Sequence, residues 1–589
     1  MPANNILRVA YAAVAAALVD HVAGAPSAPA PSGPPSSPGP SGPAGPPTQL
    51  GPPVKLANGT YRGVHNEQYQ QDFFLGIPYA QPPVGQLRFA PAQPLTVAFS
   101  EIRDASAYGP MCIGYGADTV NNGNVVDEDC LTINVVRPAG VKEGDNLPVT
   151  VWIHGGSYIM GGSSDARYNL TYIVEQSVKA GTPMVAASIN YRLNNWGFMY
   201  SSEMAEAGAG NLGLRDQRQA LRWVQENIGA FGGNKEKVTM WGESAGARSV
   251  GMQLVAYDGR SDGLFRGAMM ESGSPVAIFG TAKVWQPYFD ALVEKTGCAS
   301  NADRLGCLRA LPVATLNALF NSSAPSGGLI NGVATPPLSA VIDGDFITNQ
   351  GANLLREGKF AKVPLLLGNN FDEGTAYAKK GINTDSAFAS FLSSASQKGA
   401  DVVSQLQTLY PDDPLMGIPA FIMSRLAGAF GLQYKRSAAF AGDFQQHSGR
   451  RMLAQTYAAA GQPVYSYMWN LHVNGVPLEY GATHFQEVAF VFNNVEGRGY
   501  AASPFDNRPD TYKQLADMMS RMWVSFVNSA DPNGWKKQGK CKNNRIWPLY
   551  AGADPSNIVF DVNATDIHYL AKDDYRKEGI AYIIDNVYN

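Results

Sequence analysis

Five short apolar runs, separated by helical patterns, restrict the fold of this chain more than any other feature. The runs cover residues 149–153, 184–190, 238–241, 267–271 and 363–367. Between the second and third, Leu214, Leu221 and Val224 fall on one helical stripe. Strands that alternate with helices pair in parallel through right-handed crossovers. The sequence therefore predicts an α/β fold with a central, mostly parallel sheet flanked by helices.

The third run leads into a serine between two glycines. Gly242-Glu243-Ser244-Ala245-Gly246 follows the run and precedes a helical pattern over 247–255. Gly-x-Ser-x-Gly between a strand and a helix is typical of a nucleophile elbow, a strained turn that exposes the serine hydroxyl. The motif alone occurs by chance in a chain with 62 glycines. Its context favours Ser244 as a nucleophile.

The first run ends in a second glycine-rich turn, His154-Gly155-Gly156-Ser157. Attack on a carbonyl carbon places negative charge on its oxygen, which backbone N–H groups must stabilise. Glycines let these groups face a substrate without a side chain in the way. We expect an oxyanion hole formed by Gly156, Ser157 and Ala245, and a simple tight turn is the alternative.

A serine nucleophile needs a base, which follows it in the chain in this kind of fold. Histidines 447, 472, 484 and 568 follow Ser244. His484 is the best candidate because its loop begins at a glycine and runs into an apolar stretch, whereas His447 lies in a polar helical pattern.

The third group is an acid that holds the imidazole, and it should follow a strand between the serine and the histidine. Asp372 and Glu373 both lie directly after the fifth run. Either could instead be a solvated loop carboxylate, and spacing does not choose between them.

Five ordered motifs resemble the type-B carboxylesterase/lipase family, which includes cholinesterases and fungal lipases of the Candida rugosa type. The motifs occupy residues 74–85, 128–131, 190–192, 210–213 and 242–246. The resemblance covers nearly all of the chain from residue 54 and implies an α/β-hydrolase fold that hydrolyses carboxylic esters. It also implies that Glu373 is the acid, and it supports His484.

The resemblance implies a two-step acyl transfer on a small-molecule ester, with no metal or organic cofactor. One alternative is a lipase or steryl esterase that acts on aggregated lipid esters. Another is a non-catalytic, cholinesterase-like binding or adhesion protein, because a fold alone does not fix function. The complete set of serine, glutamate and histidine argues against this last alternative.

Five cysteines are present, and their spacing favours the pairs Cys112–Cys130 and Cys298–Cys307, with Cys541 unpaired. A pairing that uses Cys541 is the alternative. The resemblance implies the same two disulfides, together with structural ion pairs Arg88–Glu128 and Arg192–Asp216.

Two positions depart from the family pattern. The third glycine of the family's Gly-Gly-Gly is Ser157 here, which keeps the backbone N–H and adds a side chain. The loop between Cys112 and Cys130 carries a lid helix in the fungal lipases. In this chain the loop is short and rich in Asn, Gly and Asp, which do not favour a helix. We therefore expect a fixed connecting loop rather than a lid that opens.

The N-terminal residues predict secretion. Residues 1–25 carry one arginine, an apolar stretch and small residues, as a secretory signal peptide does, although an amphipathic helix is the alternative. Residues 26–53 are almost wholly Pro, Ser, Gly and Ala and predict a disordered linker, which leaves 54–589 as one catalytic domain. Four sequons are candidate glycosylation sites in a secreted protein: Asn58, Asn169, Asn321 and Asn563.

The composition argues against several classes of partner. Hydrophobic residues make up 45% of the 589-residue chain and charged residues 16%, which suits a large buried core. The formal net charge is −4, so no field of one sign favours nucleic acid or an anionic membrane. We expect no integral membrane segment, and the sequence does not indicate an oligomeric state.

Overall fold

The computed structural model describes residues 49–116, 125–323, 329–535 and 546–588. The predicted signal peptide, most of the predicted linker and Cys541 lie outside these residues. The last linker positions, 49–53, belong to strand β1 (Gln49–Leu56), which pairs with β2 (Gly59–Asn66). The register of this pair shifts between Leu50 and Pro53, which accommodates prolines that cannot donate to the ladder. Strand β1 thus includes residues 49–53, which the sequence analysis assigned to the linker.

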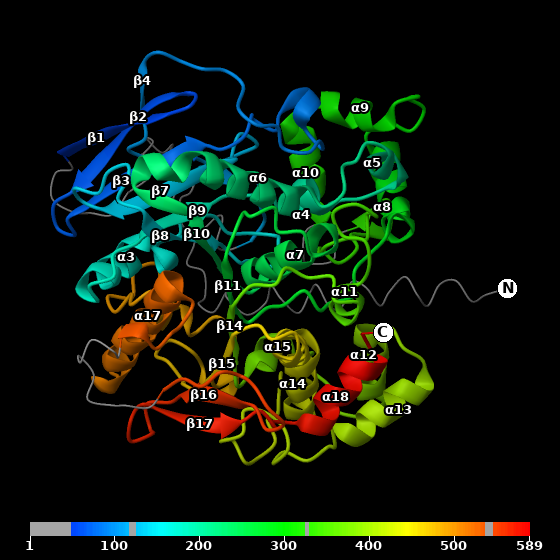
Figure 1. The fold of residues 1–589 in the computed structure, drawn as a ribbon. Coiled ribbons are helices and arrows are strands. Elements are labelled where there is room, and N and C mark those ends of the chain that lie inside the picture. Colours follow the sequence, from blue (N-terminus) through cyan, green and yellow to red (C-terminus); the bar gives the residue numbers. More distant parts are fainter. Residues whose placement is uncertain (1–48, 117–124, 324–328, 536–545, 589) are drawn as a thin grey trace, which may run out of the picture.

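One large sheet runs through the molecule (Figure 1). Its central strands are β7 (Thr132–Pro138), β9 (Val185–Ile189), β8 (Leu147–Ile153), β10 (Gly233–Glu243), β11 (Gly267–Glu271), β14 (Leu365–Asn370) and β15 (Val464–Trp469), in that spatial order. Towards the edges lie β1, β2, β3 (Gln71–Pro78) and β4 (Ile102–Asp104) on one side and β16 (Ser556–Phe560) and β17 (His568–Lys572) on the other.

The pairing confirms the predicted sheet. From β9 to β16 the neighbouring strands are parallel, and antiparallel pairs occur only towards the two edges of the described sheet. The five predicted runs coincide with β8, β9, β10, β11 and β14. Parallel strands end on the same side of a sheet, so the loops after β8, β10, β14 and β15 meet there.

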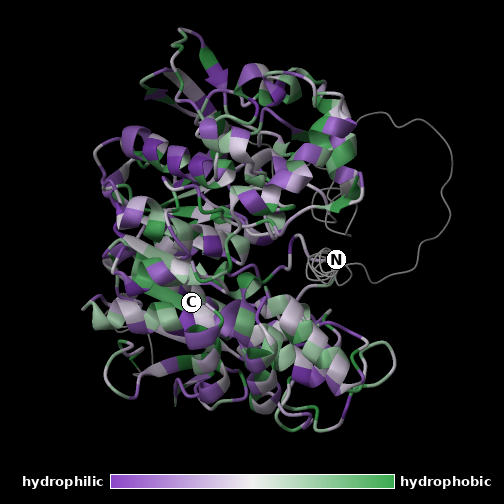
Figure 2. Cartoon of the chain, turned by 90° about the vertical axis from the view of Figure 1, so that its right-hand side faces the viewer, coloured by the Kyte–Doolittle hydropathy of each residue, from purple (hydrophilic) through white to green (hydrophobic). Residues whose placement is uncertain are grey.

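The strands are buried on both faces because helices cover the sheet on both sides. Val151 and Ile153 of β8 pack into one core cluster, and Trp152 between them packs into the other. The first face is covered by α6 (Leu212–Asn227), α7 (Ala245–Gly259) and α15 (Ser448–Ala459). The second face is covered by α3 (Leu170–Lys179) and α17 (Thr511–Ser529), and α16 (Val488–Val491) packs against α17. Figure 2 shows both hydrophilic and hydrophobic residues around the outer helices, as expected when one side of a helix packs inward.

A third core cluster lies beyond the sheet, among short helices. These are α4 (Asn194–Phe198), α5 (Ser202–Glu206), α8 (Ala282–Lys295), α9 (Arg304–Ala310) and α10 (Val313–Ser323). The remaining helices are α11 (Gly351–Arg356), α12 (Asp385–Ser396), α13 (Ala400–Leu409), α14 (Tyr434–Gly442) and α18 (Lys577–Asn586). No helix among the described residues has the length and hydropathy needed to span a bilayer.

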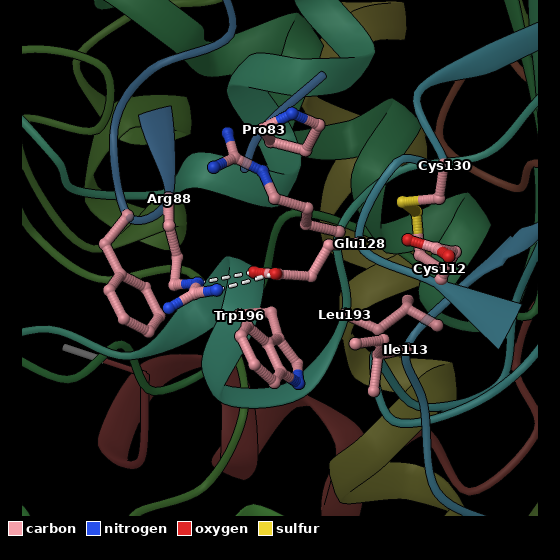
Figure 3. A pocket seen from close by; sticks show the side chains of 11 residues that line it. Pro83, Arg88, Cys112, Ile113, Glu128, Cys130, Leu193 and Trp196 are labelled. Atoms are coloured by element: carbon pink, nitrogen blue, oxygen red, sulfur yellow. Dashed lines mark hydrogen bonds and ion pairs between the residues drawn. A yellow bond between two sulfur atoms is a disulfide. The ribbon is translucent and has the colours of Figure 1, made fainter. Parts of the chain in front are cut away.

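Two disulfides tie loops outside the sheet. Cys112 bonds to Cys130 and Cys298 bonds to Cys307. Figure 3 shows the first of them beside a pocket, together with the ion pair between Arg88 and Glu128. Two short strands, β5 (Met111–Cys112) and β6 (Val126–Asp127), pair within this loop, and β12 (Leu329–Ile330) pairs with β13 (Val333–Ala334) elsewhere.

The second ion pair, Arg192–Asp216, is buried, and it generates a prediction about stability. Asp216 is 0% exposed and its two oxygens lie 2.8 and 2.6 Å from guanidinium nitrogens of Arg192. Replacing Arg192 with Met leaves a buried carboxylate without its partner, which should lower the free energy of unfolding by about 3–5 kcal/mol. Chemical denaturation followed by tryptophan fluorescence measures this loss.

Lys179→Met is the matched control, because Lys179 is 51% exposed in its ion pair with Glu175. Its cost should stay below about 1 kcal/mol. If both variants lowered the free energy of unfolding by the same amount, the buried ion pair would not have the larger contribution that we predict.

Candidate active site

Three side chains from distant parts of the chain meet at the carboxyl ends of the strands. Ser244 follows β10, Glu373 follows β14 and His484 lies between β15 and α16. Nε2 of His484 is 2.8 Å from the Ser244 Oγ, and Nδ1 is 2.7 Å from Oε2 of Glu373. The His484 side chain is 14% exposed and that of Glu373 is fully buried. This is the geometry of a nucleophile, a base and an acid that orients the base.

Ser244 stands on a sharp turn at the start of α7. Its φ of 55° and ψ of −121° are unfavourable for a residue with a side chain, and its N–H donates to the carbonyl of Glu271 at 2.8 Å. A Cβ on Gly246 would lie 2.0 Å from the carbonyl oxygen of Ile153. Glycine at this position therefore lets α7 approach β8 closely enough to hold the turn.

The two adjacent acids have different contacts. Glu373 receives hydrogen bonds at Oε1 from the hydroxyl of Ser272 and from the N–H of Asn370. Asp372 instead exchanges two bonds with Ala482: its Oδ2 accepts from the Ala482 N–H at 2.8 Å, and its own N–H donates to the Ala482 carbonyl at 3.0 Å. Glu373 thus contacts the imidazole, whereas Asp372 fastens the loop that carries it.

The glycine-rich turn after β8 faces the same site. Gly156 has φ of 99° and Ser157 has φ of 58°, both in the left-handed region. Among the backbone hydrogen bonds of the described residues, none starts from the N–H of either residue. Ala245 is the first residue of α7, where an N–H has no partner within the helix. These three N–H groups are available to an oxygen anion next to Ser244.

Three further glutamates surround the site, and the sequence analysis did not identify them. Oε1 of Glu243 lies 3.2 Å from Nε2 of His484. Burial, together with the nearby charges of Glu487 and Glu373, raises the pKa of Glu243 well above its ordinary value. Burial also raises the pKa of Glu271 well above its usual range and that of Glu487 to about 7. Glu243 was visible in the Gly-x-Ser-x-Gly motif, but nothing in the sequence indicates that Glu271 and Glu487 converge on it.

The glutamates are held by specific donors. Oε1 of Glu271 accepts from the indole N–H groups of Trp241 and Trp523 at 2.5 and 2.7 Å, and Oε2 of Glu487 accepts from Nδ2 of Asn370 at 2.6 Å.

Among the described residues, no group of three or more His, Cys, Asp or Glu side chains could hold a metal ion.

Other candidate residues lie away from this arrangement. His447 is fully buried and His472 bonds to the carbonyl of Val476. The four sequon asparagines lie at the β1–β2 turn (Asn58), at the N-terminus of α3 (Asn169), on α10 (Asn321) and after β16 (Asn563). Each is at least partly exposed. The residues that line the pocket of Figure 3 do not include Ser244, Glu373 or His484.

Comparisons with known proteins identify the family. The model of the carboxylesterase family matches residues 51–578. "Lipase 4" of Diutina rugosa is 34% identical over 571 residues, which are 91% of this chain and 96% of that protein. "Secreted lipase 1" of Botryotinia fuckeliana is 33% identical over 569 residues, covering 91% and 93% of the two chains.

Solved structures resemble the chain over nearly its whole length. Aspergillus niger EstA matches with a TM-score of 0.77 and 27% identity, covering 92% of this chain and 99% of that one. A PNB esterase matches with a TM-score of 0.71 and 26% identity, covering 90% and 99%.

Asp372 generates a prediction about the pH dependence of stability. Burial raises its pKa from the ordinary 3.8 to about 6. For a carboxyl whose pKa is raised by folding, the protonated form favours the fold. This contribution is complete below the unfolded pKa and is lost as the pH rises through about 6. Asp372→Asn keeps an oxygen that can accept from Ala482 but does not titrate.

The free energy of unfolding of the wild type, relative to that of Asp372→Asn, should therefore rise by about 1 kcal/mol between pH 7 and pH 5. Urea denaturation of both proteins at the two pH values measures the difference. A difference that does not change with pH would show that Asp372 titrates as it does in the unfolded chain.

Proposed function

The chain belongs to the carboxylesterase family, and we propose that it is a secreted carboxylic ester hydrolase that forms an acyl-enzyme on Ser244. The observation that carries this proposal is the hydrogen-bonded series from the Ser244 Oγ through His484 to Glu373. Each contact has the distance that proton transfer requires. In this proposal Ser244 is the nucleophile, His484 the general base and Glu373 the acid that orients it.

The reaction has two steps. Oγ of Ser244 attacks the ester carbonyl while Nε2 of His484 takes the hydroxyl proton. The resulting tetrahedral intermediate breaks the bond to the alkoxy oxygen, which leaves as the alcohol with the proton from His484. Water then attacks the acyl-enzyme and gives its proton to His484, and the carboxylic acid departs as the proton returns to Ser244.

Charge on the carbonyl oxygen is stabilised by the N–H groups of Gly156, Ser157 and Ala245. Their unpaired donors and the positive end of α7 support this role. The serine at 157 keeps its N–H in a left-handed conformation that glycine adopts more easily. This conformation supports the proposal that Ser157 serves as a donor although the family's third glycine is absent.

Secretion is supported by three independent features. The N-terminal 25 residues read as a signal peptide. Two disulfides are present, and such bonds persist in oxidising compartments. Relatives from Botryotinia fuckeliana and Gibberella zeae are named as secreted lipases.

A lipase is the second candidate, because several similar proteins carry that name at 31–34% identity. The described part of the Cys112–Cys130 loop favours the esterase. Ile113 and Tyr115 are 8% and 6% exposed, and Tyr115 bonds to Asn317, so this side of the loop is packed into the domain. A lid must instead separate from the domain when it opens. The centre of the loop lies outside the described residues.

Replacing Ser244 with Ala tests the proposed function. Because the nucleophile alone is lost, hydrolysis of p-nitrophenyl butyrate should fall by at least about a thousandfold while the thermal unfolding midpoint stays unchanged. Ser390→Ala is the control, since this exposed hydroxyl bonds only to its own helix at the Ser386 carbonyl. Turnover by Ser244→Ala near the wild-type rate would refute the assignment of the nucleophile.

Tributyrin separates the two enzyme classes. An esterase without a lid should turn over dissolved tributyrin with no jump in rate when the concentration passes the solubility limit. The measurement is the initial rate on both sides of saturation. A several-fold discontinuity at that point would favour the lipase instead.

A further inference from the structure

The residue directly after His484 has an unusual backbone. Phe485 has φ of 76°, in the left-handed region where aromatic residues are rare, and such a conformation costs about 1–3 kcal/mol. The surrounding structure must compensate this cost for the conformation to persist.

The chain on both sides of Phe485 is fixed. On one side the carbonyl of Thr483 accepts from Nδ2 of Asn370 at 2.8 Å. On the other side the N–H of Val488, where α16 begins, donates to the Phe485 carbonyl. The side chain of His484 is thus presented from a very short stretch, and its direction depends on the turn at Phe485.

A guanidinium lies against the ring of Phe485. The central carbon of Arg167 is 4.9 Å from the ring centroid, within the range of a cation–π contact. The Arg167 side chain is only 14% exposed, which places the contact in the desolvated regime where such pairs are worth about 2 kcal/mol or more. This magnitude is comparable to the backbone cost at Phe485.

Arg167 is itself anchored before it reaches the ring. Its Nε lies 3.0 and 3.1 Å from the two oxygens of Asp165, whose side chain is 1% exposed, and its backbone N–H donates to the same carboxylate at 2.9 Å. Arg167 belongs to the short helix η2 (Ala166–Tyr168), which packs against α16. The guanidinium is therefore held rigidly relative to the histidine loop.

The charge of Arg167 also acts at the site. Burial and the acids Glu487, Glu373 and Glu271 raise the pKa of Glu243, and the positive charge of Arg167 acts in the opposite direction. Glu243 lies 3.2 Å from Nε2 of His484. Arg167 thus offsets part of the negative charge that surrounds the imidazole.

We propose that Arg167, anchored by Asp165, is a positioning residue for His484 and acts through the ring of Phe485. This inference rests on the proposed function, in which His484 serves both acylation and deacylation. A misaligned imidazole slows both steps together, so kcat falls while KM changes little.

A double-mutant cycle tests the proposal. Arg167→Met removes the guanidinium, Phe485→Leu removes the ring, and the third protein carries both changes. The substrate is p-nitrophenyl butyrate, and kcat is expressed per active site titrated by an organophosphate. Arg167→Met should lower kcat by about 10–100-fold with KM within about threefold of wild type. The double variant should be no slower than the slower single variant.

Two further variants sharpen the test. Arg167→Lys keeps the charge but loses the planar contact and the two-point anchor, so its kcat should lie between those of wild type and Arg167→Met. Arg103→Met is the matched control, because the Arg103 guanidinium lies 3.8 Å from the Phe99 ring and pairs with Glu101 in the edge region of the sheet. Its kcat should equal that of wild type.

Each alternative outcome has a definite meaning. Losses that multiply in the double variant, or a kcat per titrated site that stays at the wild-type value, would overturn the proposal. If Arg167→Met fails to fold, Phe485→Leu tests the proposal alone. A kcat for this variant close to that of wild type would show that the Phe485 ring does not position His484 and would overturn the proposal. Failure of the proposed function is distinguished by Ser244→Ala: turnover by that variant refutes the nucleophile, whatever Arg167 does.

Discussion

The whole site depends on the close contact between the turn at Ser244 and the end of β8. Gly246 lies so near to the carbonyl of Ile153 that any side chain would force the helix and the strand apart. This contact holds Ser244 in a strained conformation at the start of α7, and a Cβ on Gly155, in the turn after β8, would lie only 3.1 Å from the Ser244 Cβ. The proposed nucleophile and its proposed oxyanion donors therefore share one packing constraint, and neither could move without the other.

A second junction links the acid and the base. Asn370, the last residue of β14, donates its backbone N–H to Glu373, and its side-chain amide bonds to both the Thr483 carbonyl and Glu487. One residue thus connects the strand that carries the acid to the loop that carries the histidine. The bonds between Asp372 and Ala482 reinforce this connection. As a result, the distance between Glu373 and His484 is set by the sheet rather than by flexible loops.

Much of this arrangement could be predicted from the sequence, because it follows from local patterns. The apolar runs identified the central strands, and the order of motifs indicated the family and the fold. Residues 49–53 were assigned to the linker because Pro52 and Pro53 resemble one in composition, whereas in the structure they lie in strand β1 at the edge of the sheet. The convergence of Glu271 and Glu487 and the contact of Arg167 with Phe485 join residues far apart in the chain. No periodicity records such contacts, since only the tertiary fold brings them together.

The prolines of β1 have a consequence for the protein in solution. A strand at the edge of a sheet presents unpaired N–H and C=O groups that can template a strand of another molecule. Pro52 and Pro53 lack N–H groups, and the shifted register at this point interrupts the straight ladder that an incoming strand would need. We therefore expect this edge to disfavour pairing with a strand of a second molecule. The same two prolines that make residues 49–53 resemble a linker in composition thus also remove donors from the outer edge of the sheet.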